Sequence, residues 1–238
     1  MNWLSGLIYR YSLVEERLEK ACARAGVSRG RVTLLAVSKF HPALAIAGLA
    51  CQGQVDFGEN YVQEALSKRQ ELDSFDGLDL RWHMIGHVQV RKAPLVAGNF
   101  AMLHSLDSPR LADALEKRLL DSGASQKVLI EVNLGEEKQK NGISPTGLES
   151  FVEHILGVCP HLSLKGLMCI PPYAHTPEES RSFFAQLRAL RDKVEKAFDV
   201  RLPELSMGMS ADFEAAVEEG ATIVRVGTDI FGERHIKK

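Results

Sequence analysis

Eight short apolar runs alternate along this chain with stretches of helical periodicity. The runs lie at positions 32–38, 55–58, 81–85, 100–106, 127–133, 164–170, 204–207 and 222–226. Apolar strands that alternate with helices are typical of a parallel sheet covered on both faces, and eight such strands close into a barrel. The sequence therefore predicts an α/β fold, a single (β/α)8 barrel of the TIM type. An open doubly wound sheet is the alternative architecture.

The stretches between the runs carry the signals of helices. They lie near 42–51, 60–71, 88–97, 108–121, 145–156, 177–198 and 210–219. Two of them open on a serine and a proline, Ser108-Pro109 and Ser144-Pro145, a common helix start. Ahead of the first run, apolar residues recur at three- and four-residue steps over 4–25, which predicts an extra N-terminal helix. No linker interrupts the pattern, so we expect one domain over 1–238.

The composition argues against several classes of partner. A net charge of −2 provides no field that would attract nucleic acid or an anionic membrane. The four cysteines form no C-x-x-C pair, which is typical of free thiols in a reducing compartment. Charged residues interrupt the N-terminal apolar pattern, unlike a signal peptide, and no run approaches the roughly 18 apolar residues of a membrane span. We therefore expect a cytoplasmic protein without nucleic-acid or membrane partners.

A lysine ends the first apolar run. Alternation places Lys39 on the same side as Leu35 and Val37, which in a barrel can be the interior. The C-terminal ends of barrel strands are where active sites lie. A partly desolvated lysine amine can attack an aldehyde and form a Schiff base. The alternative is a packed lysine stem whose ammonium reaches solvent.

Two segments near the C-terminus suit a phosphate group. Gly227 and Thr228 follow the last run, where barrels commonly bind phosphate and a glycine lets backbone N–H groups approach the anion. Ser206 and Ser210 flank Gly208 at the start of a predicted helix, whose N-terminus favours negative charge. Together these segments predict one phosphate cup. The alternatives are a helix cap at Ser210 and a turn at Gly227.

Arg225 interrupts the last apolar run. A buried guanidinium needs partners for up to five donors, so Arg225 is predicted either to bind a ligand or to form a structural ion pair with a neighbouring strand.

With these residues the chain resembles the pyridoxal phosphate (PLP) homeostasis protein family, which is related to the N-terminal barrel domain of alanine racemase. The matching segments, in order, are 35–39 (LAVSK), 57–64 (FGENYVQE), 82–86 (WHMIG), 104–107 (HSLD), 166–168 (GLM), 205–212 (LSMGMSAD) and 224–232 (VRVGTDIFG). They extend over nearly the whole chain, and their combination is far more specific than any one of them.

The resemblance implies a set of PLP-binding residues. Lys39 is implied as the Schiff-base lysine and Arg225 as the partner of the pyridine nitrogen. An arginine there leaves that nitrogen unprotonated and the cofactor a weak electron sink. The phosphate is assigned to Ser206, Ser210, Gly227 and Thr228. The other implied cofactor neighbours are Asn60, His83, Met168 and Met207. A capping amide, a core imidazole and buried packing are their alternative roles.

The resemblance also implies PLP handling that affects amino-acid and keto-acid balance, with no assigned reaction. Racemisation needs an acid or base on each face of the cofactor, and in alanine racemase one is a tyrosine of an extra β-domain of the partner subunit. Only six residues follow Gly232, so we expect that C-terminal domain to be missing. None of the four tyrosines has an evident claim to the role of second base, although the positions of Tyr61 and Tyr173 allow them to reach the rim.

Three functional hypotheses follow. The first is a monomeric PLP carrier or buffer, without assigned catalysis, that supplies PLP-dependent apo-enzymes. A weak amino-acid racemase and a barrel that binds another phosphate ligand are the alternatives. A metal centre at His83 and His87 is disfavoured, because a strand-to-helix junction separates them and no third ligand is evident.

Overall fold

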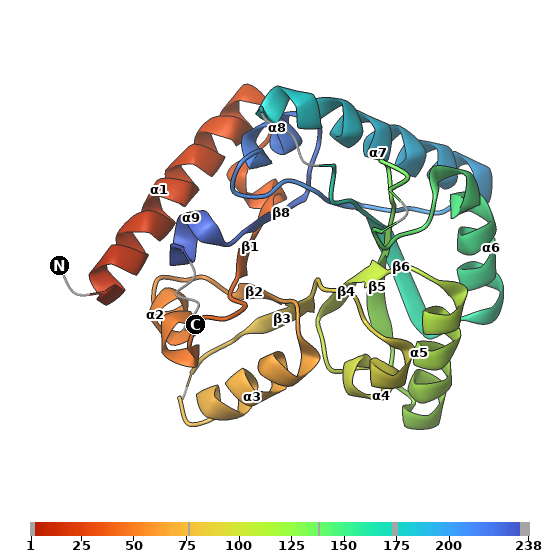
Figure 1. The fold of residues 1–238 in the computed structure, drawn as a ribbon, viewed down its shortest axis with the longest axis horizontal. Coiled ribbons are helices and arrows are strands. Elements are labelled where there is room, and N and C mark those ends of the chain that lie inside the picture. The colour runs from red at the N-terminus through yellow and green to blue at the C-terminus, as the bar shows by residue number, and fades with distance from the viewer. Residues whose placement is uncertain (1–2, 76, 138, 173–175, 234–238) are drawn as a thin grey trace.

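The computed structural model describes residues 3–75, 77–137, 139–172 and 176–233. Its strands form a closed parallel barrel in sequential order, in which β1 also pairs with β8 (Figure 1). The strands are β1 Thr33–Val37, β2 Asp56–Glu59, β3 Arg81–Met84, β4 Met102–Leu106, β5 Gln126–Glu131, β6 Leu162–Met168, β7 Glu204–Ser206 and β8 Ile223–Val226. Each overlaps a predicted strand. The predicted barrel is therefore confirmed, and the open sheet is wrong.

Helices surround the barrel, and one follows every strand (Figure 1). They are α2 Ala43–Ala50, α3 Val62–Leu72, α4 Ala93–Val96, α5 Pro109–Ser122, α6 Leu148–Val158, α7 Pro177–Phe198, α8 Phe213–Glu218 and α9 Thr228–Phe231. In the described part of the chain, no helix is long and apolar enough to cross a bilayer.

Three helices differ from the sequence-based prediction. The predicted helix at 88–97 is a 3₁₀ turn, Val90–Lys92, followed by the single turn of α4, because Pro94 is tolerated only in the first turn of a helix. The helix predicted from 210 starts at Phe213, since the Asp212 carboxylate accepts the Met209 N–H (2.8 Å) and holds a turn ahead of it. Helix α9 has only four residues, too few to give a periodic signal.

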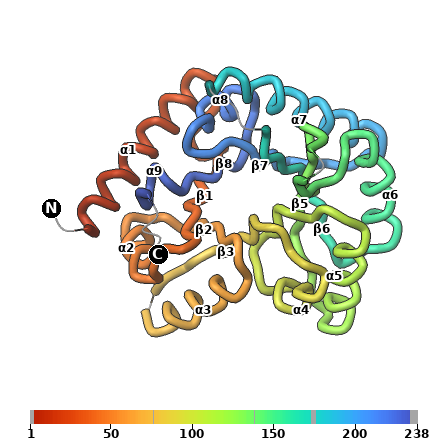
Figure 2. The backbone as a smooth tube through the Cα atoms, viewed as in Figure 1, coloured from red at the N-terminus to blue at the C-terminus, as the bar shows by residue number. Residues whose placement is uncertain are grey.

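The predicted N-terminal helix is present as α1, Trp3–Arg24, and it packs along α8 and α9 (Figure 2). The Arg17 guanidinium bonds the carboxylates of Glu214 (2.8 Å) and Asp229 (2.5 Å) and lies over the Phe213 ring. One cation thus bridges the helices that follow β7 and β8.

The barrel interior holds a small apolar cluster separate from the main core between strands and helices. Its members are Leu35, Val37, Ile85, Met102, Leu129, Met168 and Ile223. Leu35 and Val37 therefore face inward, as strand alternation predicted. On the same inward faces, His83, His104 and Arg225 alternate with the apolar residues.

Candidate functional site

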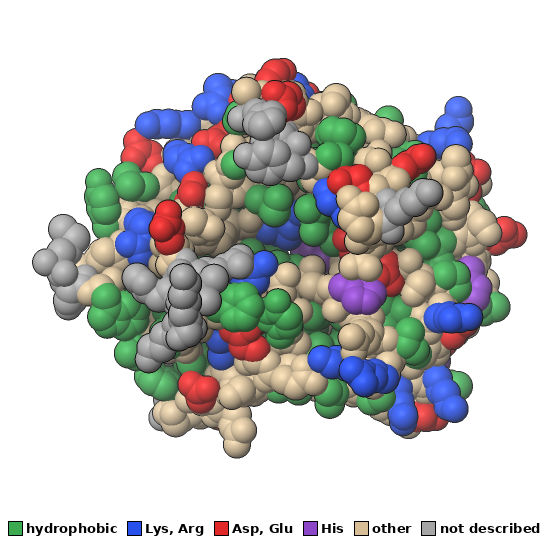
Figure 3. All heavy atoms as spheres, viewed as in Figure 1, with side chains coloured by type: hydrophobic (Ala, Val, Ile, Leu, Met, Phe, Trp, Pro, Cys, Tyr) green, Lys and Arg blue, Asp and Glu red, His purple; other side chains and the backbone are tan. Residues whose placement is uncertain are grey.

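A cavity of about 290 Å³ opens at the C-terminal mouth of the barrel. Figure 3 shows this face hollowed over the barrel centre, with basic side chains at the floor of the hollow. Its lining comes mainly from the segments after β1, β7 and β8: Val37, Lys39, His41, Asn60, Ile85, Ile170, Met209, Ser210, Ala211, Arg225, Gly227, Thr228 and Gly232. Six of the sequence-predicted site residues are among them.

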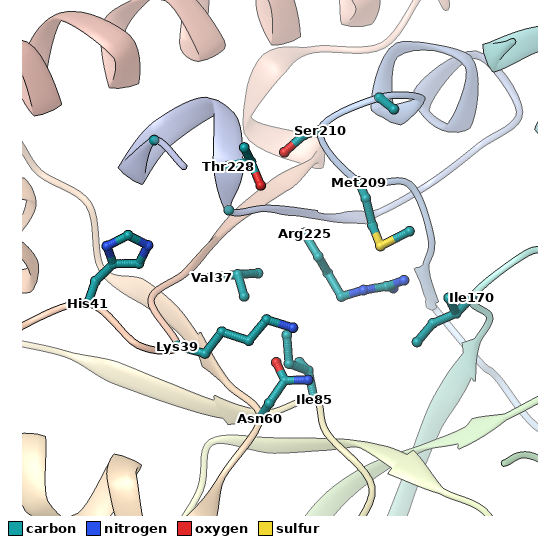
Figure 4. A pocket seen from close by; sticks show the side chains of 13 residues that line it. Val37, Lys39, His41, Asn60, Ile85, Ile170, Met209, Ser210, Arg225 and Thr228 are labelled. Atoms are coloured by element: carbon teal, nitrogen blue, oxygen red, sulfur yellow. The ribbon is translucent and has the colours of Figure 1, made fainter. Parts of the chain in front are cut away.

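Lys39 lies on the loop after β1, and its side chain extends into the cavity toward Arg225 (Figure 4). The loop is held on both sides of the lysine. Ahead of it, the Ser38 carbonyl accepts a hydrogen bond from Lys68 Nζ (2.7 Å); after it, the Phe40 N–H donates to the Glu64 carboxylate (2.5 Å). Phe40 has a φ of 65°, a left-handed conformation that is uncommon for an aromatic residue and needs such support.

The anchor of this loop is a buried ion pair. Lys68 Nζ contacts the carboxylates of Glu59 (2.7 Å) and Glu64 (2.7 Å), and the Ser38 hydroxyl donates to Glu59 (2.7 Å). Burial raises the pKa of Glu59, although Lys68 and Ser38 oppose the shift. Because an unpaired buried charge is costly, the cluster fixes the backbone that carries Lys39.

The opposite wall supplies groups suited to an anion. The hydroxyls of Ser210 and Thr228 point toward the same side of the cavity (Figure 4), and Gly227 leads into α9. At the start of α9, Ser210 Oγ accepts the Asp229 N–H (3.4 Å), and the Gly227 carbonyl accepts the N–H groups of Ile230 (3.0 Å) and Phe231 (2.8 Å). This wall can donate several hydrogen bonds to a phosphate.

Arg225 forms the floor between the two walls. Its Nη1 donates to Ser206 Oγ (2.7 Å) and its Nη2 to the Cys169 carbonyl (2.9 Å). Neither partner is charged, so these contacts are not the structural ion pair that sequence reasoning allowed. Burial lowers the pKa of the guanidinium, and nearby acidic groups such as Glu131 oppose the shift. An arginine remains cationic even so, and its charge faces the cavity.

Asn60 lies on the wall formed by the end of β2. Its Oδ1 is buried without a hydrogen-bond partner among the described residues. Its backbone touches Gly86, where a Cβ atom would lie 2.3 Å from the Asn60 carbonyl oxygen. Glycine is therefore required at 86, and the amide oxygen of Asn60 is available to a ligand.

Comparison with known proteins places this barrel in a family. The family model described as alanine racemase, N-terminal domain, matches residues 14–235. Two proteins called pyridoxal phosphate homeostasis protein are similar to the chain, one of Aquifex aeolicus (47% identity, covering 94% of this chain and 97% of the relative) and one of Escherichia coli K12 (36%, covering 99% and 100%). The chain belongs to the pyridoxal phosphate homeostasis protein family.

Solved structures of the family have the same fold. PipY of Synechococcus elongatus, described as having PLP bound, superposes with a TM-score of 0.80 at 39% identity and covers 92% of this chain and 100% of its own. An alanine racemase of Corynebacterium glutamicum superposes with a TM-score of 0.70 at 17% identity, which shows the shared fold alone. This chain spans 62% of that racemase.

Four residues that the family resemblance placed near the cofactor do not line the cavity. Met168 belongs to the apolar interior cluster, and Met207 to the core outside the barrel. His83 and Ser206 lie inside the barrel below the cavity, each in hydrogen bonds to His104 (2.9 Å for both). Alternation along a strand gives the face of a residue, but not its depth within a barrel.

Several lining residues had no sequence-based assignment. The side chains among them are His41, Ile85, Ile170 and Met209, with Val37 and Ala211. Their only shared signal is position, because each lies at or just beyond the C-terminal end of a predicted strand. His41 also stacks on the Phe231 ring of α9 (4.8 Å between centroids).

The other sequence-based candidates lie apart from the cavity lining. Tyr61 is half exposed and packs on Phe40, whereas Tyr173 lies outside the described residues. His83 bonds Asp56 (3.0 Å) and His87 bonds Asp107 (2.7 Å), so the two histidines have different carboxylate partners. One group on the outer helices, Asp113, His154 and Cys159, has donor atoms within 4.8 Å of one another and could hold a metal ion.

Proposed function

We propose that this protein binds PLP covalently through Lys39 and acts as a carrier or buffer of the cofactor. The observation that carries the proposal is a cavity with the Lys39 amine on one wall and groups suited to a phosphate on the other, joined through paired β1 and β8. PLP is a pyridine aldehyde with a phosphate ester on the neighbouring ring carbon and the ring nitrogen opposite the aldehyde. PipY, 39% identical, is described with PLP bound.

The residues of the cavity fit this group. The volume of about 290 Å³ is near the lower end of the roughly 300–1,000 Å³ of small-molecule sites, as expected for a cofactor with one ring. Bound PLP supplies an aldehyde that condenses with a neutral primary amine and releases one water. Ser210, Gly227 and Thr228 would hold the phosphate, Arg225 would donate toward the ring nitrogen, and the unpartnered Asn60 oxygen would accept a polar group.

The lining favours holding the cofactor over catalysis. Among the described lining residues, the side chains that carry a basic or acidic group are Lys39, His41 and Arg225, and the histidine stacks on Phe231. A proton transfer on both faces of the cofactor needs two such groups placed on opposite sides. A carrier needs only the lysine and the phosphate wall.

Borohydride reduction followed by peptide mass spectrometry tests the attachment. PLP-loaded protein is expected to carry a reduced adduct on Lys39, and Lys39→Ala is expected to lose both the adduct and the visible absorbance. Lys117→Ala, which removes an exposed lysine of α5, is the matched control and should keep both. An adduct absent from Lys39 in the wild-type protein would show that PLP is bound differently or not at all.

Transfer to an apo-enzyme tests the carrier role. We propose that the chain acts as a cytoplasmic monomer with PLP-dependent apo-enzymes as partners; the free thiols of all four cysteines are consistent with that compartment. Loaded protein should activate an apo-aminotransferase faster than the same concentration of free PLP mixed with Lys39→Ala protein. Equal activation rates would argue against a carrier. Analytical ultracentrifugation tests the oligomeric state, and a sedimenting dimer would contradict the proposed monomer.

A weak amino-acid racemase is the second candidate, favoured by Glu131. This carboxyl ends β5, is 8% exposed and interacts electrostatically with Arg225 of the cavity floor, but it is not among the described residues that line the cavity. Its pKa is raised to about 7, first by burial and then by Asp107, which suits a group that accepts and donates protons at neutral pH. The activity predicts Lys39-dependent deuterium exchange at Cα of an amino acid, and no exchange across a broad panel would eliminate it.

A further inference from the structure

A row of hydrogen-bonded side chains crosses the barrel interior beneath the cavity. The links join Arg225 Nη1 to Ser206 Oγ (2.7 Å), Ser206 Oγ to His104 Nδ1 (2.9 Å), His104 Nε2 to His83 Nδ1 (2.9 Å), and His83 Nε2 to Asp56 Oδ1 (3.0 Å). The residues come from β8, β7, β4, β3 and β2. Each is at most 8% exposed, so the row lies within the barrel from the cavity floor to the first residue of β2.

The surroundings of this row make its contacts costly to lose. The side chains that alternate with it on the strands, Ile85, Met102 and Ile223, are apolar and buried. Barrel interiors are usually filled by branched apolar residues, and a buried polar group without a partner destabilises the fold. The row is satisfied at its far end, where Asp56 also accepts a hydrogen bond from the exposed Arg81 (2.6 Å).

Asp56 sets the direction of the hydrogen bonds in the row when both histidines are neutral. A carboxylate only accepts, so His83 carries its proton on Nε2 and donates it to Asp56, and its bare Nδ1 accepts from the Nε2–H of His104. Nδ1 of His104 then has no proton and accepts from the Ser206 hydroxyl. Ser206 Oγ in turn accepts from Arg225 Nη1, because a guanidinium only donates. Each link then has one donor and one acceptor.

The other protonation states fit less well. A proton added to His83 would reverse its bond to His104, which would then donate from Nδ1 to Ser206 and leave that hydroxyl proton without its acceptor in the row. Burial lowers the pKa of His104 well below its ordinary value, and His83 and Arg225 lower it further. Burial alone would raise the pKa of Asp56, but His83 and Arg81 outweigh this and lower it. His104 therefore stays neutral and Asp56 stays ionised at neutral pH.

We infer that Ser206, His104, His83 and Asp56 form a one-directional hydrogen-bond relay that positions the Arg225 guanidinium toward the cavity. Both histidines in it are neutral and carry the proton on Nε2. The relay commits one N–H of Nη1, and the Cys169 carbonyl commits one of Nη2 (2.9 Å), so the orientation of the guanidinium plane is fixed before a ligand arrives. These four are positioning residues; for the identity of the ligand the inference rests on the proposed function.

The tautomers can be measured without any ligand. Long-range ¹H–¹⁵N spectra of ligand-free protein with ¹⁵N-labelled histidine should show His83 and His104 as Nε2–H imidazoles at about pH 8. His154 and His161, both partly exposed, provide reference signals in the same sample. An Nδ1–H form or an imidazolium at either relay position would overturn the inference. Because PLP is absent, this result does not depend on the proposed function.

A serine pair tests the effect on the cavity. Ser206→Ala removes the acceptor of Arg225, and because hydrogen bonds to charged groups are strong, PLP should bind roughly tenfold or more weakly. Ser180→Ala, a buried serine of α7, is the control and should keep wild-type affinity. Ser206→Thr, which restores a hydroxyl, should recover most of the binding. Affinity of Ser206→Ala within about twofold of the control would refute the positioning role. Loss of the Lys39 adduct in wild-type protein would instead contradict the proposed function. If Ser206→Ala does not fold, the tautomer measurement still decides.

Discussion

Replacing Glu131 with glutamine should change how the stability of the ligand-free protein depends on pH. Burial and the charge of Asp107 raise the pKa of Glu131 from 4.5 to about 7, while Arg225 and His87 act in the opposite direction. The folded state therefore holds this proton more tightly than the unfolded state. The stabilisation is complete below about pH 4.5 and is lost as the pH rises through about 7.

The size of the effect follows from the two pKa values. A difference of about 2.5 between them corresponds to roughly 3 kcal/mol of unfolding free energy, at about 1.4 kcal/mol for each tenfold change in proton affinity. Glutamine does not ionise, so Glu131→Gln should lack this decline. Relative to wild type, the variant should gain up to roughly 3 kcal/mol between about pH 5 and pH 8.

Urea unfolding at a series of pH values measures this difference directly. Glu153→Gln, which alters an exposed glutamate of α6, is the matched control and should follow the wild-type profile. A difference between Glu131→Gln and wild type that does not change with pH would refute the reasoning. So would a gain that appears on the acidic side, because that would require a lowered pKa.

Two further substitutions test the walls of the cavity. Gly86→Ala should cost about 1–3 kcal/mol of stability and weaken PLP retention, because its Cβ would overlap a backbone carbonyl. Gly157→Ala, in an open helical position, is the control and should be neutral or slightly stabilising. Equal melting temperatures for the two variants would contradict the close approach of Gly86 to Asn60. Lys68→Met should destabilise the protein by about 3–5 kcal/mol, because it leaves the Glu59 carboxyl buried without its cation. Lys20→Met, at an exposed pair, is the control and should change the unfolding midpoint little. Similar midpoints for the two variants would show that the buried pair does not hold the loop that carries Lys39.

The barrel could be predicted from the sequence because parallel strands are buried on both faces. Such strands read as continuous apolar runs, and the helices between them have a different period, so all eight strands were found to within two residues at either end. The four-residue α9 was missed, since one turn leaves no periodic signal, and α4 is shorter than the helix predicted at 88–97.

The site could be predicted only in part. Lys39, Arg225 and the residues after β7 and β8 converge on one cavity because strand ends meet at the same rim. His83 and Ser206 lie one layer deeper, where they contact His104. A single sequence gives no register between neighbouring strands, so it cannot tell which inward residues share a layer.

The pairing of β1 with β8 has a consequence for how the protein is made. One wall of the cavity comes from residue 39 and the other from residues 210–228, so the ribosome must synthesise more than 170 residues after the lysine before the two walls can meet. A nascent or truncated polypeptide holds the lysine without its anion-binding partner. Capture of the cofactor would thus report that synthesis has passed the last strand and that the barrel has closed.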